Sequence, residues 1–246
     1  MRIMKFMLVL FLVVIFKAES KEIYWYLAAS MTKPAKEIVQ LFNSKYKNDS
    51  MILITGGSGE LLSKIYASKK GELYTPADET FLNRAINMGV IKKYKPILVQ
   101  EPVFALSNKT RHHISKIEEI CKENIKIAIG NPKTMAIGKT FETMKKQMPI
   151  DLYKCINEKK AIDPINISQT VNYLKNNVVD LGLLFKSTAK VNNLKYIELP
   201  PTWNIKVKAY LAKLIYSNDD NVTERAINFI EDNLNIFKAN GFDTLK

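Results

Sequence analysis

Histidine and cysteine are both scarce in this 246-residue sequence, which contains two residues of each. His112 and His113 are adjacent in a basic, loop-like stretch, so we interpret them as surface polar residues. No cluster of histidine, cysteine and carboxylate residues has the spacing of metal ligands. These absences argue against a histidine-dependent enzyme, and we expect no catalytic residue and no resident metal or other cofactor.

The sequence also lacks internal repeats, low-complexity stretches and nucleic-acid-binding motifs. Its formal net charge is +13, with 37 Lys and Arg against 24 Asp and Glu, but the lysines are scattered along the chain. We therefore expect no nucleic-acid partner. The basic charge would still steer anions toward the protein.

Residues 1–20 match a cleavable signal peptide. A basic start is followed by an apolar run over residues 6–16. Ala18-Glu19-Ser20 then places small residues at the two positions that a signal peptidase recognises at its cleavage site. The run is too short to span a membrane comfortably, and no later segment resembles a transmembrane helix. A retained N-terminal anchor is the alternative, and the absence of a cysteine after the run argues against a lipoprotein. We expect a soluble, exported, periplasmic protein that begins near Lys21.

The 226 residues after the signal peptide keep a net charge of +11, since the first twenty contribute +2. This length suits one large domain or two small ones. Cys121 and Cys155 both lie in this part of the chain. In an oxidising periplasm they could form a disulfide or remain two buried thiols, and the sequence leaves both alternatives open.

The stretch Thr55-Gly56-Gly57-Ser58-Gly59 organises the rest of the chain. It lies between a predicted buried strand, 51–54, and a predicted amphipathic helix, 60–69. Glycines let a backbone approach a ligand closely, and the N-terminus of a helix presents free N–H groups and a partial positive charge. The pattern favours an anion as ligand, although such turns also cap helices in proteins that bind nothing. Glu60 should point to solvent. If it pointed inward, its carboxylate would accept a proton from the ligand and the site would admit a protonated anion.

A second turn of the same kind comes earlier in the chain. A predicted strand over 23–28 is followed by Ala29-Ser30-Met31-Thr32 and by a predicted helix over 33–46, with Pro34 in its first turn. In a parallel sheet both turns lie at the carboxyl ends of the strands, where ligands bind. Two hydroxyl-bearing helix N-termini that face one point predict an anion site.

The remaining pattern predicts an α/β fold of two domains. A strand at 72–75 and a helix that ends at Gly89 complete the first group of elements, and an extended run over 96–107 follows. The second group consists of a strand over 125–129, helices ending near 147 and 176, and a strand over 180–185. An extended run over 194–212 and a helix over 221–239 complete the chain. Two extended crossings indicate that one domain interrupts the other. We therefore predict domain I at 21–98 and 202–246, domain II at 99–201, a two-stranded hinge and a cleft between the domains.

Leu27-Ala28-Ala29-Ser30-Met31-Thr32 resembles the A-A-S-L-T start of the periplasmic molybdate-binding proteins of ABC importers, and the Gly-Gly-Ser-Gly turn resembles theirs. Segments 77–79, 127–138 and 180–187 fall in that family's order and spacing, so the resemblance covers nearly all of residues 22–240. It implies a type II periplasmic-binding-protein fold. It also implies a monomeric receptor for molybdate or tungstate, without enzyme activity, that delivers its oxyanion to a membrane permease.

The resemblance also implies the ligand contacts. Ser30 and Ser58 would supply hydroxyl and backbone donors from domain I. Ile137 and Ile167 would supply backbone N–H groups from domain II, at two helix N-termini. A pocket made only of donors favours a fully deprotonated tetrahedral oxyanion and should reject phosphate, which usually carries a proton near neutral pH.

Phe185 departs from the family pattern, because that position is often a tyrosine whose hydroxyl binds the ligand. A lost donor to a charged group costs about 1.5–3 kcal/mol. Either another donor substitutes, such as Thr134, Lys186 or Ser187, or the site makes one bond fewer.

Three other functions compete with this one. A serine hydrolase would need a nucleophile elbow, but the sequence around Ser58 lacks its final glycine. A receptor for a different anion or for ferric ion is the second alternative; Tyr24 and Tyr26 could ligate iron, but they are typical strand residues. A sensory domain is the third, and no DNA-binding or signalling segment remains for it to control.

Overall fold

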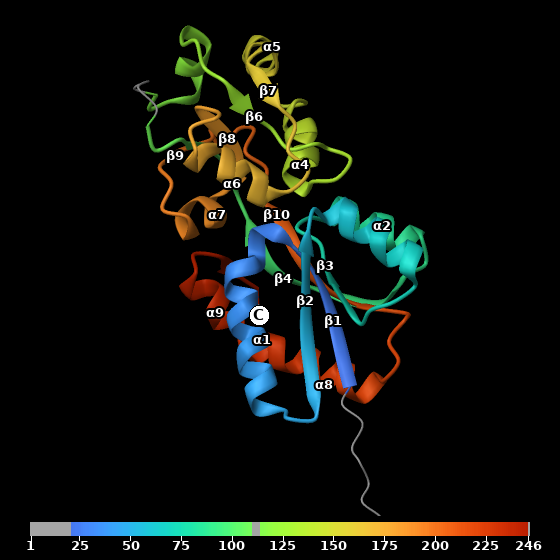
Figure 1. The fold of residues 1–246 in the computed structure, drawn as a ribbon. Helices are drawn as coiled ribbons and strands as arrows, with labels where there is room; N and C mark the ends of the chain where they lie inside the picture. The colour runs from blue at the N-terminus through green and yellow to red at the C-terminus, as the bar shows by residue number, and fades with distance from the viewer. Residues whose placement is uncertain (1–20, 110–113, 246) are drawn as a thin grey trace, which may run out of the picture.

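The computed structural model describes residues 21–109 and 114–245. The chain forms two lobes, each built on one β-sheet with helices packed against it (Figure 1). The predicted signal peptide, together with His112 and His113, lies outside the described residues. The predicted α/β fold class is confirmed.

The first lobe contains a six-stranded sheet. Its strands are β1 (Lys21–Ala28), β2 (Asp49–Gly56), β3 (Leu73–Thr75), β4 (Ile91–Gln100), β10 (Val207–Leu214) and β11 (Asp243–Thr244). They lie in the order β11-β4-β10-β3-β1-β2. The strand β1 pairs in parallel with β2 and β3, and Ala28 lies opposite Gly56. The two predicted ligand-binding turns therefore leave the same edge of the sheet, as the sequence predicts.

Helices cover the first sheet because each has one apolar face. They are η1 (Ala29–Met31), α1 (Thr32–Lys45), α2 (Ser58–Ser68), α3 (Glu79–Asn87), α8 (Asp220–Asp232) and α9 (Leu234–Ala239). The spacing of Ala35, Ile38 and Phe42 places them on one buried side of α1. Trp25 is fully buried beneath these helices, and its indole N–H donates to the Thr75 hydroxyl at 2.9 Å.

The second lobe contains a five-stranded sheet in the order β7-β6-β8-β5-β9. Its strands are β5 (Pro102–Leu106), β6 (Ile127–Ala128), β7 (Lys160–Ile162), β8 (Leu181–Phe185) and β9 (Tyr196–Glu198). Its helices are η2 (Ile117–Lys122), α4 (Ala136–Met144), α5 (Ile150–Glu158), α6 (Ile167–Lys175) and α7 (Lys186–Val191). The strand β8 is buried along its whole length and pairs with β6 in parallel and with β5 in the antiparallel direction.

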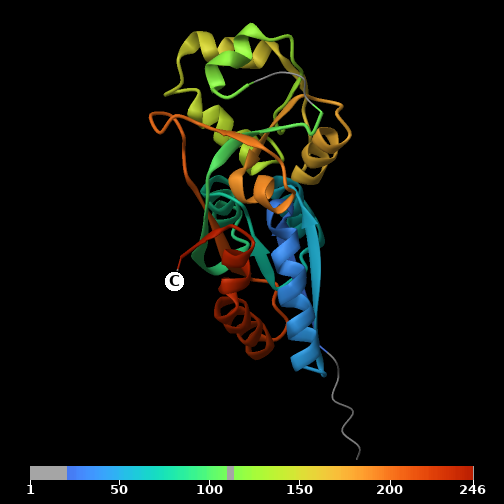
Figure 2. The same ribbon diagram turned by 90° about the vertical axis from the view of Figure 1, so that its left-hand side faces the viewer.

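The chain passes between the lobes twice, at Glu101 and again over residues 199–206 (Figure 2). Side chains join the two passages, since the Asn204 amide donates to Glu101 Oε1 at 3.0 Å and Lys186 lies 3.6 Å from the other oxygen. The strand β4 continues to Gln100, beyond the predicted domain boundary at residue 98. The division of the chain into two domains stays a prediction.

Several short elements were not predicted. The strands β7 and β11 and the helix α7 are too short to show a period, and α5 follows Pro149 directly. The predicted C-terminal helix is divided at Asn233, where α8 ends and α9 begins. Across the described residues, we find no helix with the length and apolar character needed to cross a membrane.

Cys121 and Cys155 form a disulfide that links η2 to α5, across a sequence separation of 34 residues. This result answers the question that the sequence leaves open. The bond fixes a part of the second lobe in which regular elements are short. A cross-link of this kind stabilises a fold chiefly by restricting the unfolded chain.

Replacing both cysteines, Cys121→Ser with Cys155→Ser, should lower the free energy of unfolding by about 3 kcal/mol. Urea unfolding of the variant and the parent protein measures this difference. The parent protein with added reductant should unfold like the variant. Equal unfolding midpoints for all three samples would contradict the prediction.

Candidate functional site

A small cavity lies between the two lobes, where β1 and β2 end. Its volume, counted as the space open to the centre of a water molecule, is about 20 Å³. All five residues that the resemblance predicts as ligand contacts line it: Ser30, Ser58, Ile137, Ile167 and Phe185. Their role in binding stays a prediction, but the structure brings the five together. Of the described residues, none that lines the cavity is charged.

Three helices begin at this cavity. Ser58 is the first residue of α2 and Ile167 the first of α6, while Ile137 is the second residue of α4. The first N–H groups of a helix have no partner within it and lie at the positive end of its dipole. The cavity therefore offers neutral donors from both lobes to an anion, without a carboxylate that could accept a proton from the ligand.

A chain of hydrogen bonds links the two serine hydroxyls. Ser58 Oγ accepts the Ala77 N–H at 3.1 Å, so its own proton is left to be donated. The Ala77 carbonyl accepts the Gln100 side-chain N–H at 2.9 Å, and Gln100 Oε1 accepts the Ser30 hydroxyl at 3.3 Å. The long final bond is the weakest of the three, so the Ser30 hydroxyl can turn toward a ligand at low cost.

Gln100 is the site-related residue that the sequence analysis missed. It is 2 % exposed, at the end of β4 where the chain leaves the first lobe. It touches both the Ser30 hydroxyl and the Ala77 carbonyl, which belong to different segments. A glutamine directly after the apolar run Ile97-Leu98-Val99 was the available signal, but nothing local links it to either serine.

Phe185 lies at the end of β8 and lines the cavity with its side chain 1 % exposed. None of the three substitute donors lines the cavity. The Thr134 hydroxyl faces the Asn131 carbonyl at 3.5 Å, Lys186 pairs with Glu198 at 2.6 Å, and the buried Ser187 hydroxyl has no partner among the described residues. The cavity therefore has no side-chain donor in place of the family's tyrosine.

Glu60 does not line the cavity, in agreement with the expectation that it points away from the ligand. Its carboxylate accepts the Gly57 N–H at 3.1 Å, which satisfies the backbone donor of the N-cap residue of α2. The cavity wall thus lacks a carboxylate that could accept the proton of a protonated anion.

The backbones of the two lobes touch beside the cavity. The Gly59 N–H donates to the Thr134 carbonyl of the second lobe at 2.9 Å. A Cβ atom on Gly57 would lie 2.6 Å from both the Thr134 and the Ile165 carbonyl oxygens. Only glycine permits this approach, so Gly57 and Gly59 bring the lobes together as well as presenting α2.

Asp78 caps α3 next to the cavity-lining Ala77, and its carboxylate accepts the Phe81 N–H at 3.1 Å. Burial disfavours the charged carboxylate and raises the pKa of Asp78 to about 6, although the bond from Phe81 acts in the opposite direction. The folded protein therefore binds this proton more tightly than the unfolded chain.

Asp78→Asn should stabilise the protein above pH 6. In the parent protein, the contribution of Asp78 to stability falls as the pH rises from about 4 to about 6, because the unfolded chain loses this proton first; the loss is at most about 3 kcal/mol. Asparagine keeps the cap without a charge, so its stability should not show this fall. Urea unfolding at intervals from pH 4 to pH 8 compares the two proteins. Parallel curves would contradict the prediction.

The residues that the alternative functions need do not meet in the cavity. Tyr24 and Tyr26 lie on β1, away from the cavity wall, and the Tyr24 hydroxyl donates to Glu22. Ser58 Oγ is bonded to a backbone N–H, whereas a hydrolase would need a histidine there. In residues 21–109 and 114–245, no group of three or more His, Cys, Asp or Glu side chains could hold a metal ion.

Two α/β lobes joined by two crossing segments, with a neutral, donor-lined cavity between them, define a solute-binding protein. A model of the family described as bacterial extracellular solute-binding protein matches residues 23–243, and the chain belongs to this family. A Haemophilus influenzae protein described as a binding protein is 24% identical over 174 residues, which cover 71% of this chain and 70% of the relative.

Solved structures show the same fold. The sulfate-binding protein SubI from Mycobacterium tuberculosis superposes with a TM-score of 0.81 at 14% identity, covering 92% of this chain and 88% of its own. The periplasmic molybdate-binding protein of Azotobacter vinelandii gives 0.77 at 14% identity, covering 91% of this chain and 100% of its own. The periplasmic-binding-protein fold is therefore confirmed, and these relatives are binding proteins.

Proposed function

We propose that this protein is an extracytoplasmic receptor that captures a tetrahedral oxyanion, molybdate or tungstate, and delivers it to an ABC importer. It is exported by a cleavable signal peptide, acts as a monomer and carries out no reaction. The observation that carries the proposal is the small cavity in which Ser30 and Ser58 face the helix starts at Ile137 and Ile167. The fold of the Azotobacter molybdate-binding protein supports it.

The cavity suits a compact, doubly charged and fully deprotonated anion. Removing such an ion from water is costly, and several fixed dipoles must offset that cost. The hydroxyls and helix N-termini supply those dipoles without a competing negative charge. A protonated phosphate would find no acceptor for its proton, and the small volume disfavours large organic ligands.

Binding would then act by shifting a conformational equilibrium. The donors come from two lobes, so an anion completes its contacts only when the lobes are together. A ligand with such differential affinity favours the closed form. The membrane permease would recognise the loaded receptor by that form.

Calorimetric titration with molybdate, tungstate, sulfate and phosphate tests the proposal. Tight binding of the first two, weaker binding of sulfate and no binding of phosphate are the expected results. Tight binding of sulfate instead would move the assignment to a sulfate receptor. Binding of none of the four would overturn the proposal.

Phe185→Tyr should strengthen oxyanion binding by about tenfold or more, because it restores a hydroxyl donor at the cavity wall. The same titration measures the change, with Phe185→Leu as the control for altered packing. Thermal unfolding checks that each variant is folded. A Tyr variant that folds normally but binds no better than the parent would show that this position does not donate to the ligand.

A further inference from the structure

A second hollow adjoins the cavity, on the side where α1 faces α6 and α7. Its volume, counted in the same way as for the cavity, is about 350 Å³. It shares Ala29, Ser30 and Ile167 with the cavity wall, so the same three residues border both spaces. We call this hollow the outer groove. Both α6 and α7 contact η1 beside it, so both lobes form its walls.

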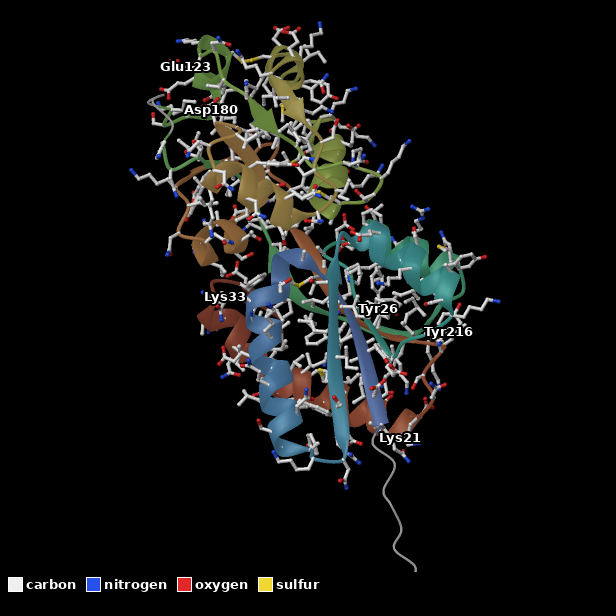
Figure 3. All side chains as sticks on the ribbon, in the orientation of Figure 1. Lys21, Tyr26, Lys33, Glu123, Asp180 and Tyr216 are labelled. Atoms are coloured by element: carbon white, nitrogen blue, oxygen red, sulfur yellow. A yellow bond between two sulfur atoms is a disulfide. The ribbon has the colours of Figure 1, made fainter. Side chains whose placement is uncertain are left out.

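The charge of the outer groove is of one sign. Lys33, Lys36 and Lys175 line it, and no aspartate or glutamate is among its lining residues. Lys33 and Lys36 lie three residues apart on α1 and therefore share one side of the helix. Figure 3 shows Lys33 at the end of α1 that faces the second lobe. Glu37, the adjacent acid on α1, is exposed and does not line the groove.

Donors in the groove are available to a ligand. Neither Lys33 nor Lys36 forms an ion pair with a described residue, and the ammonium of Lys175 is held by Asn192 Oδ1 at 2.9 Å. Thr188 also lines the groove; it is 3 % exposed and its hydroxyl has no hydrogen-bond partner among the described residues. A buried hydroxyl without a partner costs free energy unless a ligand or water satisfies it.

We propose that the outer groove binds a carboxylate, so that the protein also takes small organic anions with a tetrahedral oxyanion group at one end and a carboxylate at the other. The oxyanion group occupies the cavity and the carboxylate accepts from the lysines. Lys33 and Lys36 are exposed, so each contributes a modest ion pair, and the two together favour a carboxylate at this place. This inference rests on the proposed oxyanion site and extends its ligand class.

The test compares two anions that differ only in the carboxylate, sulfoacetate and methanesulfonate. Their sulfonate groups carry no proton near neutral pH, so the donor-only cavity treats both heads alike. Calorimetry should show sulfoacetate binding about tenfold more tightly. In the double variant Lys33→Gln with Lys36→Gln this ratio should fall to near one, whereas binding of molybdate should persist.

A charge-matched control is Lys64→Gln with Lys238→Gln, since both residues are exposed and neither lines the groove. The control should keep the tenfold ratio, because nonspecific attraction changes equally in both variants. A ratio near one in the parent protein, or a ratio unchanged by the groove substitutions, overturns the inference.

The outcome separates this inference from the proposed function. Molybdate binding with a sulfoacetate ratio near one would retain the oxyanion receptor and reject the groove. Lysine-dependent sulfoacetate binding without molybdate binding would retain the groove and reject molybdate as ligand. Binding of neither would reject both.

Discussion

Gly57→Ala should weaken oxyanion binding by about 10–100-fold, because its methyl group holds the lobes apart. Gly57 has φ −67° and ψ 143°, which alanine adopts without strain. The added Cβ would lie 2.6 Å from the carbonyl oxygens of Thr134 and Ile165. Both oxygens belong to the second lobe and neither can rotate away, so the closed arrangement must open slightly to accommodate the methyl group.

Calorimetry measures the affinity, and small-angle X-ray scattering with saturating molybdate measures the compaction. Gly56→Ala is the matched control, since Gly56 also lines the cavity but the atoms nearest to its Cβ would belong to the flexible Glu60 and Leu61 side chains of its own lobe. Thermal unfolding of Gly57→Ala should change little, because the clash exists only when the lobes meet. Unchanged affinity in Gly57→Ala would show that the lobes bind the ligand in a more open arrangement.

Ile167→Pro should reduce oxyanion affinity by about 10–100-fold relative to Ile167→Ala, because proline removes the backbone N–H. Proline is well tolerated at the first position of a helix. The preceding Asn166 has φ −150° and ψ 163°, an extended conformation that a following proline favours. The Asn166 side chain caps α6 by accepting the Gln169 N–H, and that bond is unaffected.

Both variants lose the isoleucine side chain, so their difference reports the replacement of the N–H group at the start of α6 by the proline ring carbon Cδ. Circular dichroism and thermal unfolding should show the helix intact in both. Equal affinities for the proline and alanine variants would exclude this N–H group as a ligand contact.

The site was predictable from the sequence where local pattern and order along the chain carried the information. Ser30 and Ser58 each follow a strand and precede a helix, and parallel pairing of β1 with β2 brings those turns together. Ile137 and Ile167 came from the family resemblance, and they line the same cavity. For the two serines the signal was a strand, a turn and a helix start that follow one another along the chain.

What could not be predicted depends on contacts between distant segments. Gln100 joins Ser30 to Ala77, which lie in two other segments, and only the folded chain shows that they meet. The disulfide depends on the packing of η2 against α5, which no spacing rule determines. The outer groove depends on how α1 faces α6 and α7, so its lysines look like any others in a lysine-rich chain.

The hydrogen bond from Gly59 to the Thr134 carbonyl has a kinetic consequence. Both of its atoms are main-chain atoms, so the ligand does not compete for them. Parting of the lobes requires this bond to break, and we expect an anion held by donors from both lobes to leave by that route. Dissociation should therefore be limited by the parting of the lobes, whatever the anion, and the residence times of different oxyanions should differ less than their equilibrium affinities.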